Sequence, residues 1–568
     1  MSLDPQRLAA DPRLSAFVTA NAGSGKTKTL IDRVARLLLA GAQPETILCV
    51  TYTKAAAAEM QRRLYDLLGG WSVCDDAALR DELSRLEGRA ADAYDHRGLS
   101  KARALFASAL ETPGGLKIQT IHAFCEKLLR RFPLEAGVSP GFRVIDDAAS
   151  AAVAEAARKA VARHALRGAD TVAEAYARFS IALDFQSFQG MFAAFEAQRG
   201  ALGAYIDRCG GLEGAVADVW RVCGFDEPAD PQAIEAAAMA GLDRSAWKDC
   251  AEILDQGGKA DQVNAGKLAA AIGPEGGFDA CLAALFTEKG ESTPVAWVAK
   301  TSGLKTREDL RFFLLAEQDR LALARERRRA ARVAQDTQGA LLLAGAYLAA
   351  YAIEKAAAGA LDFTDLVEKT RDLVAARPRA AWVLYKLDGG VDHILVDEAQ
   401  DTAPEQWRIV RALTEEFFSG AGKPVSRMLE RNMFVVGDEK QSIYSFQGAR
   451  PELLIQEFEF HKDRATGAGF RFERVDLLAS WRSTPQVLRF VDAAFAPAEL
   501  AGAILPRIEA EAIRHQAVRT DHGCVDLWPL EREEKGDLRE AWDAPLDQEG
   551  EASANKRLAE RSPARSRR

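Results

Sequence analysis

The chain has 568 residues, of which 48% are hydrophobic and 28% are charged, so it is long enough for roughly three or four domains. Its net charge of -9 argues against a uniformly basic nucleic-acid coat protein, although a local basic groove could still bind DNA. The eight cysteines form no C-x-x-C pair, which argues against a zinc site or a disulfide framework. The polar first residues and the short, alanine-rich apolar run Gly339 to Ile353 predict a cytoplasmic protein without a membrane segment.

The first predicted elements surround the stretch AFVTANAGSGKTKT, Ala16 to Thr29. Phe17 to Ala20 has the pattern of a buried strand, a glycine loop follows, and a helix is predicted from Lys26. This is the layout of a P-loop, in which backbone N–H groups and a helix N-terminus bind phosphate. Lys26 would reach the β- and γ-phosphates, and the Thr27 hydroxyl would bind magnesium. Ala20 replaces the first glycine of the pattern, and a P-loop match on its own can be decorative.

The next segment predicts a second strand and helix. Ile47 to Thr53 is an apolar, β-branched run, and an amphipathic helix is predicted from near Lys54. Strand, P-loop, helix, strand and helix open a doubly wound α/β domain, in which ligands bind at the carboxyl ends of the strands. Tyr52 stands at such an end, where it could stack on a base or could simply pack against its neighbours.

Residues 116–359 contain one further strand pattern and a long helical region. Leu116 to Phe124 is predicted as a strand, and His122 near its end is either a phosphate or base contact or a packed histidine. From Asp147 to Gly359, alanine-rich segments predict a helical insertion. Its densest basic run, Arg325 to Arg332, is either a solvated helix face or a stripe that binds backbone phosphates.

The α/β pattern resumes after Leu361 with the strand His393 to Glu398, HILVDE, which ends in two carboxylates. Two acids beside a buried strand are unfavourable unless the site is wet, cationic or metal-bearing. Asp397 would complete a magnesium shell through water, and Glu398 would orient or deprotonate the attacking water. A helix N-cap with a surface acid is the alternative, and the P-loop earlier in the chain argues against it.

A strand at Met433 to Val436 leads into GDEKQSIYSFQGA. Gln441 is placed beyond the strand end, where it could sense a γ-phosphate. Tyr444 and Phe446 offer aromatic faces, and base stacking on such rings stabilises binding by roughly 1–3 kcal/mol each.

The last predicted strand, Val475 to Ala479, is followed by SWRSTPQVLRFV. Arg482 in this segment is a candidate arginine finger, which would stabilise charge on the phosphoryl oxygens. Taken alone, it would count as an ordinary arginine at the start of a helix.

Seven motifs occur in one order: AGSGKT, VTYTKAAAAEM, TIHAFC, LDFTDL, VDEAQDT, VVGDEKQSIYSFQGA and ASWRS. Together they closely resemble the superfamily 1 helicases of the UvrD/Rep/RecB kind. The DEAQD and GDEKQSIYSFQGA strings are the most telling, because P-loop kinases and GTPases do not carry them. The chain also lacks the LSGGQ signature of ABC ATPases. The NAGSGKT opening and the SIYSFQGA form look most like the AddA branch, the helicase–nuclease subunits of double-strand-break repair complexes.

The resemblance implies ATP and Mg2+ as ligands. Gln6, which alone would be interpreted as a solvated polar residue, would contact adenine, and Trp481 would lie against the nucleotide. The residues implied to hold nucleotide and metal are Gln6, Ala20, Asn21, Ala22, Gly23, Ser24, Gly25, Lys26, Thr27, Asp397 and Trp481. Those implied in catalysis are Glu398, Gln441 and Arg482, and those implied in DNA binding are Tyr52, His122, Tyr444 and Phe446. Gln447 stands where many relatives have arginine, so that phosphate contact is not expected here.

The resulting fold class is α/β: a P-loop RecA-like parallel sheet flanked by helices, with a large all-helical insertion and an incomplete second RecA-like domain. We expect the first motor domain at 1–146 and 360–470, the insertion at 147–359 and the start of the second motor domain at 471–530. A polar and basic tail, 531–568, is expected to be disordered. The family's later motor motifs and the AddA nuclease are missing, which predicts an N-terminal part of a larger motor.

The implied activity is ATP-driven 3′→5′ translocation on single-stranded DNA, with opening of the duplex ahead. The implied partners are single-stranded and duplex DNA and an AddB-like second subunit. Two alternatives remain: a non-motor DNA-binding subunit with a regulatory ATP site, and an ATPase that acts on a substrate other than nucleic acid.

Overall fold

The computed structural model describes most of the chain up to residue 532. The described residues are 4–532 without 114, 288–289, 296, 301–303, 376–379, 381, 384–385, 387–390, 416, 419–428, 445–447, 498, 501–514 and 528, together with 554, 558 and 559. They form two compact units. Unit 1 comprises Met1–Leu128 and Thr370–Arg568, and unit 2 comprises Leu129–Lys369.

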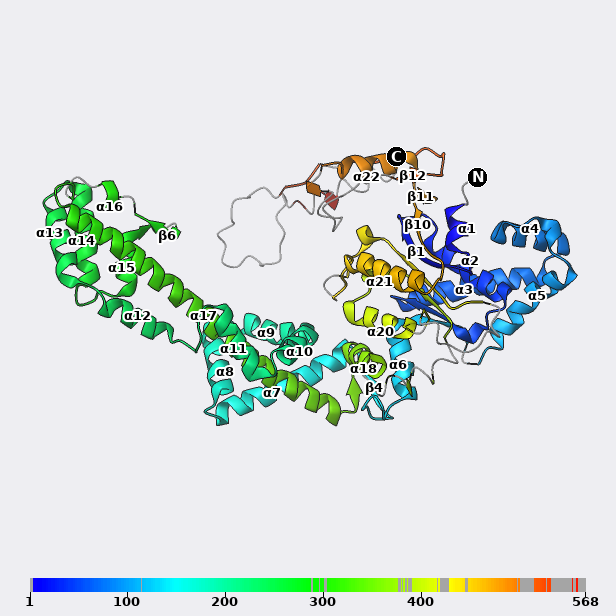
Figure 1. Cartoon of the computed structure of the whole chain (residues 1–568), viewed down its shortest axis with the longest axis horizontal. Coiled ribbons are helices and arrows are strands. Elements are labelled where there is room, and N and C mark those ends of the chain that lie inside the picture. Colours follow the sequence, from blue (N-terminus) through cyan, green and yellow to red (C-terminus); the bar gives the residue numbers. More distant parts are fainter. Residues whose placement is uncertain are drawn as a thin grey trace. The chain divides into compact units, whose positions relative to one another are not determined.

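Unit 1 is built on a six-stranded parallel sheet (Figure 1). Its strand order is β10-β1-β9-β8-β2-β3. The strands are β1 (Ser15–Ala20), β2 (Ile47–Thr51), β3 (Lys117–Thr120), β8 (His393–Val396), β9 (Asn432–Gly437) and β10 (Phe472–Leu477). All residues of β2, β8 and β9 are buried, as expected for parallel strands with helices on both faces. The predicted α/β fold with a parallel sheet is confirmed.

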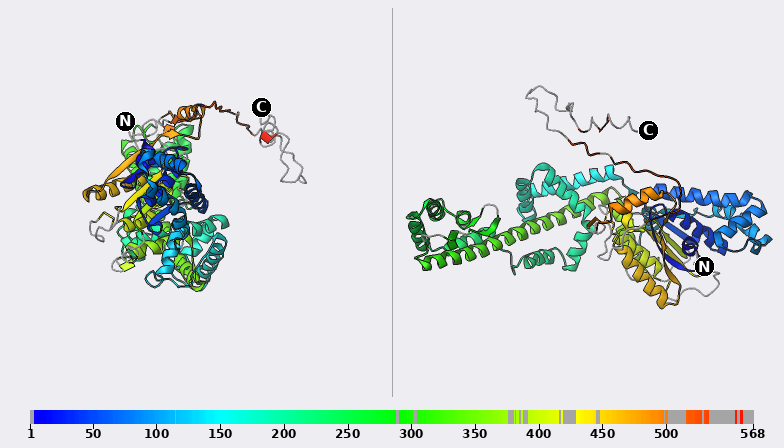
Figure 2. Two further views of the ribbon diagram at one scale, coloured as in Figure 1. Left: turned by 90° about the vertical axis from the view of Figure 1, so that its right-hand side faces the viewer. Right: turned by 90° about the horizontal axis from the view of Figure 1, so that it is seen from above.

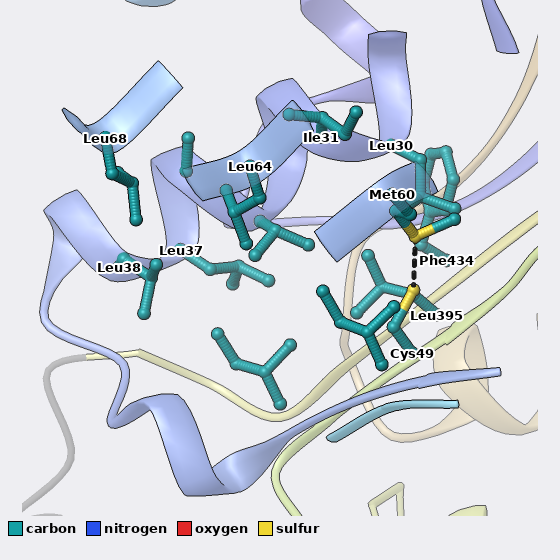
Figure 3. Close-up of a cluster of buried hydrophobic side chains, with 14 of the residues drawn as sticks. Leu30, Ile31, Leu37, Leu38, Cys49, Met60, Leu64, Leu68, Leu395 and Phe434 are labelled. Carbon is teal, nitrogen blue, oxygen red and sulfur yellow. Dashed lines mark hydrogen bonds between the residues drawn. The ribbon is translucent and has the colours of Figure 1, made fainter. Parts of the chain in front are cut away.

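Helices cover both faces of this sheet. The helices that begin and end in unit 1 are α1 (Pro5–Ala9), α2 (Lys26–Ala40), α3 (Lys54–Val73), α4 (Asp76–Glu87), α5 (His96–Leu110), α20 (Pro404–Thr414), α21 (Leu453–Gly467) and α22 (Pro485–Ala494), while α6 (Ile121–Arg131) and α18 (Phe363–Ala375) continue into unit 2. On one face, α2 and α3 pack leucines over Cys49, whose thiol lies 3.3 Å from the Met60 sulfur (Figure 3). On the other face, Phe17 contacts Trp407 of α20 and Phe458 of α21. Successive residues of β1 thus point to opposite layers, which fixes the strand between them.

The predicted strand Leu116 to Phe124 is wrong in its second half. Strand β3 ends at Thr120 and helix α6 begins at Ile121, so His122 lies in the first turn of a helix. The Thr120 hydroxyl accepts the Ala123 N–H at 3.2 Å, which is the hydrogen bond of an N-cap. The apolar run continues through the cap, so its composition alone does not mark the change from strand to helix.

The expected start of a second domain at residue 471 differs from the structure. Strand β10 pairs with β1 from Ser15↔Phe472 to Ala20↔Leu477, and Val475 and Leu477 belong to the main core. The first sheet therefore includes this strand. A separate two-stranded sheet follows, made of β11 (Ala479–Ser480) and β12 (Gln516–Ala517). The prediction about the tail, 531–568, falls almost entirely outside the described residues.

Unit 2 is mainly helical, and the 50-residue helix α17 runs through it (Figure 2). Its helices are α7 (Asp147–Arg167), α8 (Thr171–Ala182), α9 (Phe185–Ala197), α10 (Arg199–Arg208), α11 (Leu212–Val222), α12 (Pro231–Ala240), α13 (Arg244–Asp255), α14 (Lys259–Ile272), α15 (Phe278–Leu285), α16 (Trp297–Lys300) and α17 (Glu308–Ala357). Its strands are β4 (Arg143–Val144) with β7 (Ala360–Leu361), and the hairpin β5 (Phe286–Thr287) with β6 (Gly290–Pro294). The unit is therefore not all-helical, because it includes short paired strands.

The basic run on α17 is neither a solvated face nor a phosphate-binding stripe at its central residues. Arg325 and Arg328 are buried. The Arg325 guanidinium lies 4.6 Å from the centre of the Phe286 ring, and Arg328 binds Asp279 at 2.7 Å and Glu235 at 3.0 Å. These arginines hold α12, α15 and the β5–β6 hairpin against α17. Their charge is used within the unit.

Helix α17 is long and apolar enough, by length and composition alone, to cross a membrane. A long core helix of a soluble protein meets the same criterion, so a single such helix is weak evidence. In this unit, α17 is contacted by α7, α8, α11 and α12, and it carries the buried Arg325 and Arg328. These contacts and charges are those of a core helix.

Candidate nucleotide-binding and catalytic site

The P-loop connects the end of β1 at Ala20 to the start of α2 at Lys26. Gly23 and Gly25 have φ values of 74° and 90°, in the left-handed region that favours glycine. A Cβ added at Gly23 would lie 2.5 Å from the Arg482 Cβ, and one added at Gly25 would lie 3.0 Å from the Gln6 amide nitrogen. Both the backbone conformation and the available space therefore require glycine in this loop.

Gln6 lies in the short helix α1 and contacts the same loop. Its side-chain amide donates a hydrogen bond to the Ser24 carbonyl oxygen at 2.9 Å. This placement contradicts the interpretation of Gln6 as a solvated residue. It brings the side chain to the loop where the resemblance expects it.

The segment after β10 also lies against the P-loop. The Trp481 N–H donates to the Gly23 carbonyl oxygen at 2.8 Å, and the Asn21 N–H donates to the Leu477 carbonyl oxygen at 3.1 Å. The Trp481 side chain is 57% exposed, and Arg482 is also exposed. Both residues are therefore beside the loop with side chains accessible to a ligand.

Lys26 meets two residues that follow other strands of the sheet. Its ammonium group lies 3.0 Å from the Glu398 carboxylate, after β8, and 3.4 Å from the Gln441 side-chain oxygen, after β9. Glu398 has a φ of 49° and is the one non-glycine residue with positive φ in the described part of the chain. Such a conformation costs of order 1–3 kcal/mol and is concentrated at functional sites.

Asp397 has the environment of a metal ligand. Burial, reinforced by the neighbouring Glu398 charge, raises the pKa of Asp397 to about 7 in spite of Lys26. Its Oδ1 atom is buried and has no hydrogen-bond partner among the described residues. An unsatisfied carboxylate oxygen and the Thr27 hydroxyl are hard oxygen donors, which fit Mg2+. No group of three or more His, Cys, Asp or Glu that could hold a metal ion exists among the described residues. Magnesium typically uses only one or two carboxylates together with phosphate and water.

Two residues that sequence analysis missed complete a closed hydrogen-bonded ring. The Gln400 amide nitrogen donates to Glu398 at 2.8 Å, and the Gln400 oxygen accepts the Asp438 N–H at 2.9 Å. The Asp438 carboxylate accepts from the Gln441 amide at 2.5 Å, and Gln441 returns to Lys26. A sequence signal existed, because both residues follow closely on buried strands in VDEAQDT and VVGDEKQ.

The candidate DNA-binding residues are brought together only in part. The rings of Tyr52 and Tyr444 lie with their centres 4.2 Å apart, and burial raises the pKa of Tyr52 to about 12. Burial lowers the pKa of His122, which favours its neutral form. A cavity of about 10 Å³, large enough for about one water, is lined by Tyr52 and also by Asp397 and Glu398. Phe446 lies outside the described residues.

The parallel sheet, the P-loop at the end of β1 and the acids after β8 define a P-loop nucleotide-binding protein of the RecA-like class. Residues 4–462 match the UvrD/REP helicase N-terminal domain, and the chain belongs to this family. The resemblance seen in the sequence is confirmed.

Curated relatives are named as the AddA-type subunits of ATP-dependent helicase/nucleases. The chain is 27% identical to the one from Pelotomaculum thermopropionicum, over 84% of this chain and 37% of that protein. It is 24% identical to the one from Exiguobacterium sibiricum, over 85% of this chain and 39% of that protein. It is 26% identical to the one from Enterococcus faecalis, over 84% of this chain and 37% of that protein. The chain thus spans less than two-fifths of the length of these relatives.

Proposed function

We propose that this chain is the ATP-hydrolysing part of a DNA helicase that acts in double-strand-break repair. The observation that carries the proposal is the convergence of Lys26 with Glu398 and Gln441, which lie 372 and 415 residues away in sequence. This set holds a cation for phosphate, a carboxylate for water and an amide for the γ-phosphate at the ends of three neighbouring strands. The family membership and the names of the relatives support the same activity.

The P-loop residues Ala20, Asn21, Ala22, Gly23, Ser24, Gly25, Lys26 and Thr27 would hold the triphosphate of ATP. Gln6 would contact adenine, and Trp481 would lie against the nucleotide. Thr27 and Asp397 would hold Mg2+, which supplies neutralisation of phosphate charge when it is bound.

Glu398 would act as the general base. In the chain without nucleotide, the Lys26 ammonium group binds this carboxylate at 3.0 Å. A phosphate that attracts Lys26 would free Glu398 to accept a proton from water. Gln441 would sense the γ-phosphate, and the exposed Arg482 would serve as the arginine finger that stabilises charge on it.

DNA would bind along the aromatic residues beside the acids. The Tyr52–Tyr444 pair supports this proposal, since aromatic faces stack on bases regardless of sequence. His122 and Phe446 would extend the contact. We propose 3′→5′ translocation on single-stranded DNA, opening of the duplex ahead, and a cytoplasmic heterodimer with an AddB-like subunit. Unit 2 would be the accessory insertion of the motor, and the β11–β12 sheet would begin its second RecA-like domain.

Measurement of ATP hydrolysis with and without single-stranded DNA tests this function. We expect DNA to stimulate hydrolysis, and Lys26→Ala to reduce the stimulated rate by at least about 100-fold, because a charge that stabilises the transition state is lost. Lys28→Ala is the matched control: Lys28 is exposed on the same helix and pairs with Asp32 at 2.5 Å. Its rate should stay within about twofold of wild type, because exposed pairs contribute little. ATP binding without DNA-stimulated hydrolysis would contradict the motor and favour a regulatory ATP site.

A further inference from the structure

We propose that Gln400 is a positioning residue that holds the Glu398 carboxylate and joins it to the segment 437–441, which carries Gln441. The proposal rests on the proposed ATPase function. Gln400 is 2% exposed and lies directly between the two strand ends that supply Glu398 and Gln441. Its amide binds both: the nitrogen donates to Glu398 at 2.8 Å and the oxygen accepts from the Asp438 N–H at 2.9 Å.

The chemistry of its partners fixes the orientation of the Gln400 amide. A backbone N–H can only donate, so the group that faces Asp438 must be the amide oxygen. The NH2 group must then face Glu398, and an ionised carboxylate can only accept. A side chain with both a donor and an acceptor at these two points is therefore required, and glutamine supplies them with the correct length.

The backbone beside Gln400 leaves room for this contact. A Cβ added at Gly437 would lie 2.9 Å from the Gln400 side-chain oxygen and 3.2 Å from the Gln400 backbone nitrogen. Glycine at position 437 thus permits the close approach of the two strand ends. A methyl group there would displace Gln400 without altering any side chain of the ring.

The bridge transmits position because both of its ends are held. Asp438 is 1% exposed, and its carboxylate accepts from the Gln441 amide at 2.5 Å and from the Lys440 ammonium group at 2.8 Å. A movement of Gln441 toward a γ-phosphate would therefore move Asp438 and, through Gln400, the Glu398 carboxylate. The orientation of the base would depend on whether the sensor segment is engaged.

Three variants test the bridge in the full chain. Gln400→Leu removes the donor and the acceptor, Gln400→Glu keeps the acceptor but places a second carboxylate against Glu398, and Gly437→Ala displaces an unchanged Gln400. Gln318→Glu is the matched control, since Gln318 is also buried, and its amide donates to the Leu285 carbonyl oxygen in unit 2. The readouts are kcat and KM for DNA-stimulated ATP hydrolysis, and hydrogen exchange of the Asp438 amide without nucleotide.

We expect kcat to fall by about 10- to 100-fold in all three variants, with KM within about threefold, because the base is misplaced and the phosphate contacts remain. The Asp438 amide should exchange about tenfold faster in Gln400→Leu and Gly437→Ala, and at the wild-type rate in Gln400→Glu. The Gln318→Glu control should keep the wild-type kcat and exchange rate.

A wild-type kcat in Gln400→Leu, or unchanged Asp438 exchange in that variant, would overturn the inference. Equal losses in kcat and in ATP binding would also overturn it, because they would indicate a general structural role. A wild-type chain that hydrolyses no ATP would instead overturn the proposed function. The exchange measurement would then still decide whether Gln400 holds the sensor segment.

Discussion

Each unit contains a buried cluster of charged side chains, and the two clusters differ in how far their polar atoms are satisfied. In unit 2, Arg199 and Lys355 surround Asp362 and Asp365 at the start of α18, and all four carboxylate oxygens accept hydrogen bonds. In unit 1, the Asp397 Oδ1 atom is buried without a partner among the described residues. The Glu398 side chain is 36% exposed.

The difference separates a structural cluster from a binding site. Burying charge is unfavourable unless it is paired, so a fully paired cluster is explained by the fold itself. A buried carboxylate oxygen without a partner is explained by a ligand that the fold is built to receive. The same kinds of residue, aspartate with lysine or arginine, therefore have opposite meanings in the two units.

The strongest test of this contrast is Glu398→Gln, which removes a charge from the unsatisfied cluster. We expect kcat for ATP hydrolysis to fall by about 10²–10⁴-fold, because an amide cannot act as general base, while ATP binding is retained. Stability should change by less than about 1 kcal/mol, since Glu398 is partly exposed. Steady-state kinetics, nucleotide binding and urea unfolding measure the three quantities.

Glu405→Gln is the control for this loss of charge. Glu405 lies on α20 in the same unit and pairs with Arg371 at 2.6 Å. Its kcat should stay within about threefold of wild type. A comparable loss of kcat in both variants would show that Glu398 has no special role.

The second test, Arg199→Met, breaks the satisfied cluster. Two buried carboxylates would lose their principal partner, and we expect unit 2 to lose about 3–5 kcal/mol of stability. Hydrogen exchange in α10 and α18 should report this loss. In Arg178→Met, whose exposed partner is Asp336, the same measurement should change by at most about 1 kcal/mol. Equal effects of the two variants would contradict the assignment of a structural role to the Arg199 cluster.

The smallest expected effect is the pH dependence of unit 2. Burial acts to raise the pKa of Asp362, but the hydrogen bonds and charge of Arg199, with the charge of Lys355, hold it below its ordinary value. A lowered pKa in the folded state means that the stabilisation is present above about pH 4 and is lost as the pH falls below it. Exchange in α18 should therefore increase from pH 5 to pH 3 beyond the intrinsic effect of pH. Asp362→Asn should flatten this dependence, and an unchanged profile in that variant would assign the effect to other groups.

Much of the fold and of the site could be predicted because its signals are local. The apolar runs at residues 47–51 and 433–436 and the glycine loop before Lys26 are dictated by neighbouring residues, and the structure contains the corresponding strands and helix. Lys26, Glu398 and Gln441 were identified because each directly follows such a strand or loop. Gln6 could be placed only through the family resemblance, since nothing in its surroundings in the sequence marks it.

Errors arose where tertiary contacts decide. The strand at residues 472–477 looked like the start of another domain, yet its pairing with β1 places it in the first sheet. The arginines of α17 looked like a solvated or phosphate-binding face, yet their partners Glu235, Asp279 and Phe286 come from elements distant in sequence.

The sequence alone determined the class of the protein, the elements of its sheet and the residue types of its site, because hydrophobic periodicity and glycine or carboxylate positions act over a few residues. The tertiary structure alone decided which polar groups are satisfied. It paired Arg199 with Asp362 and left the Asp397 oxygen without a partner among the described residues, and it closed the ring through Gln400 and Asp438. The physical reason is that the environment of a charge depends on every chain segment that packs around it, and those segments are brought together only by folding.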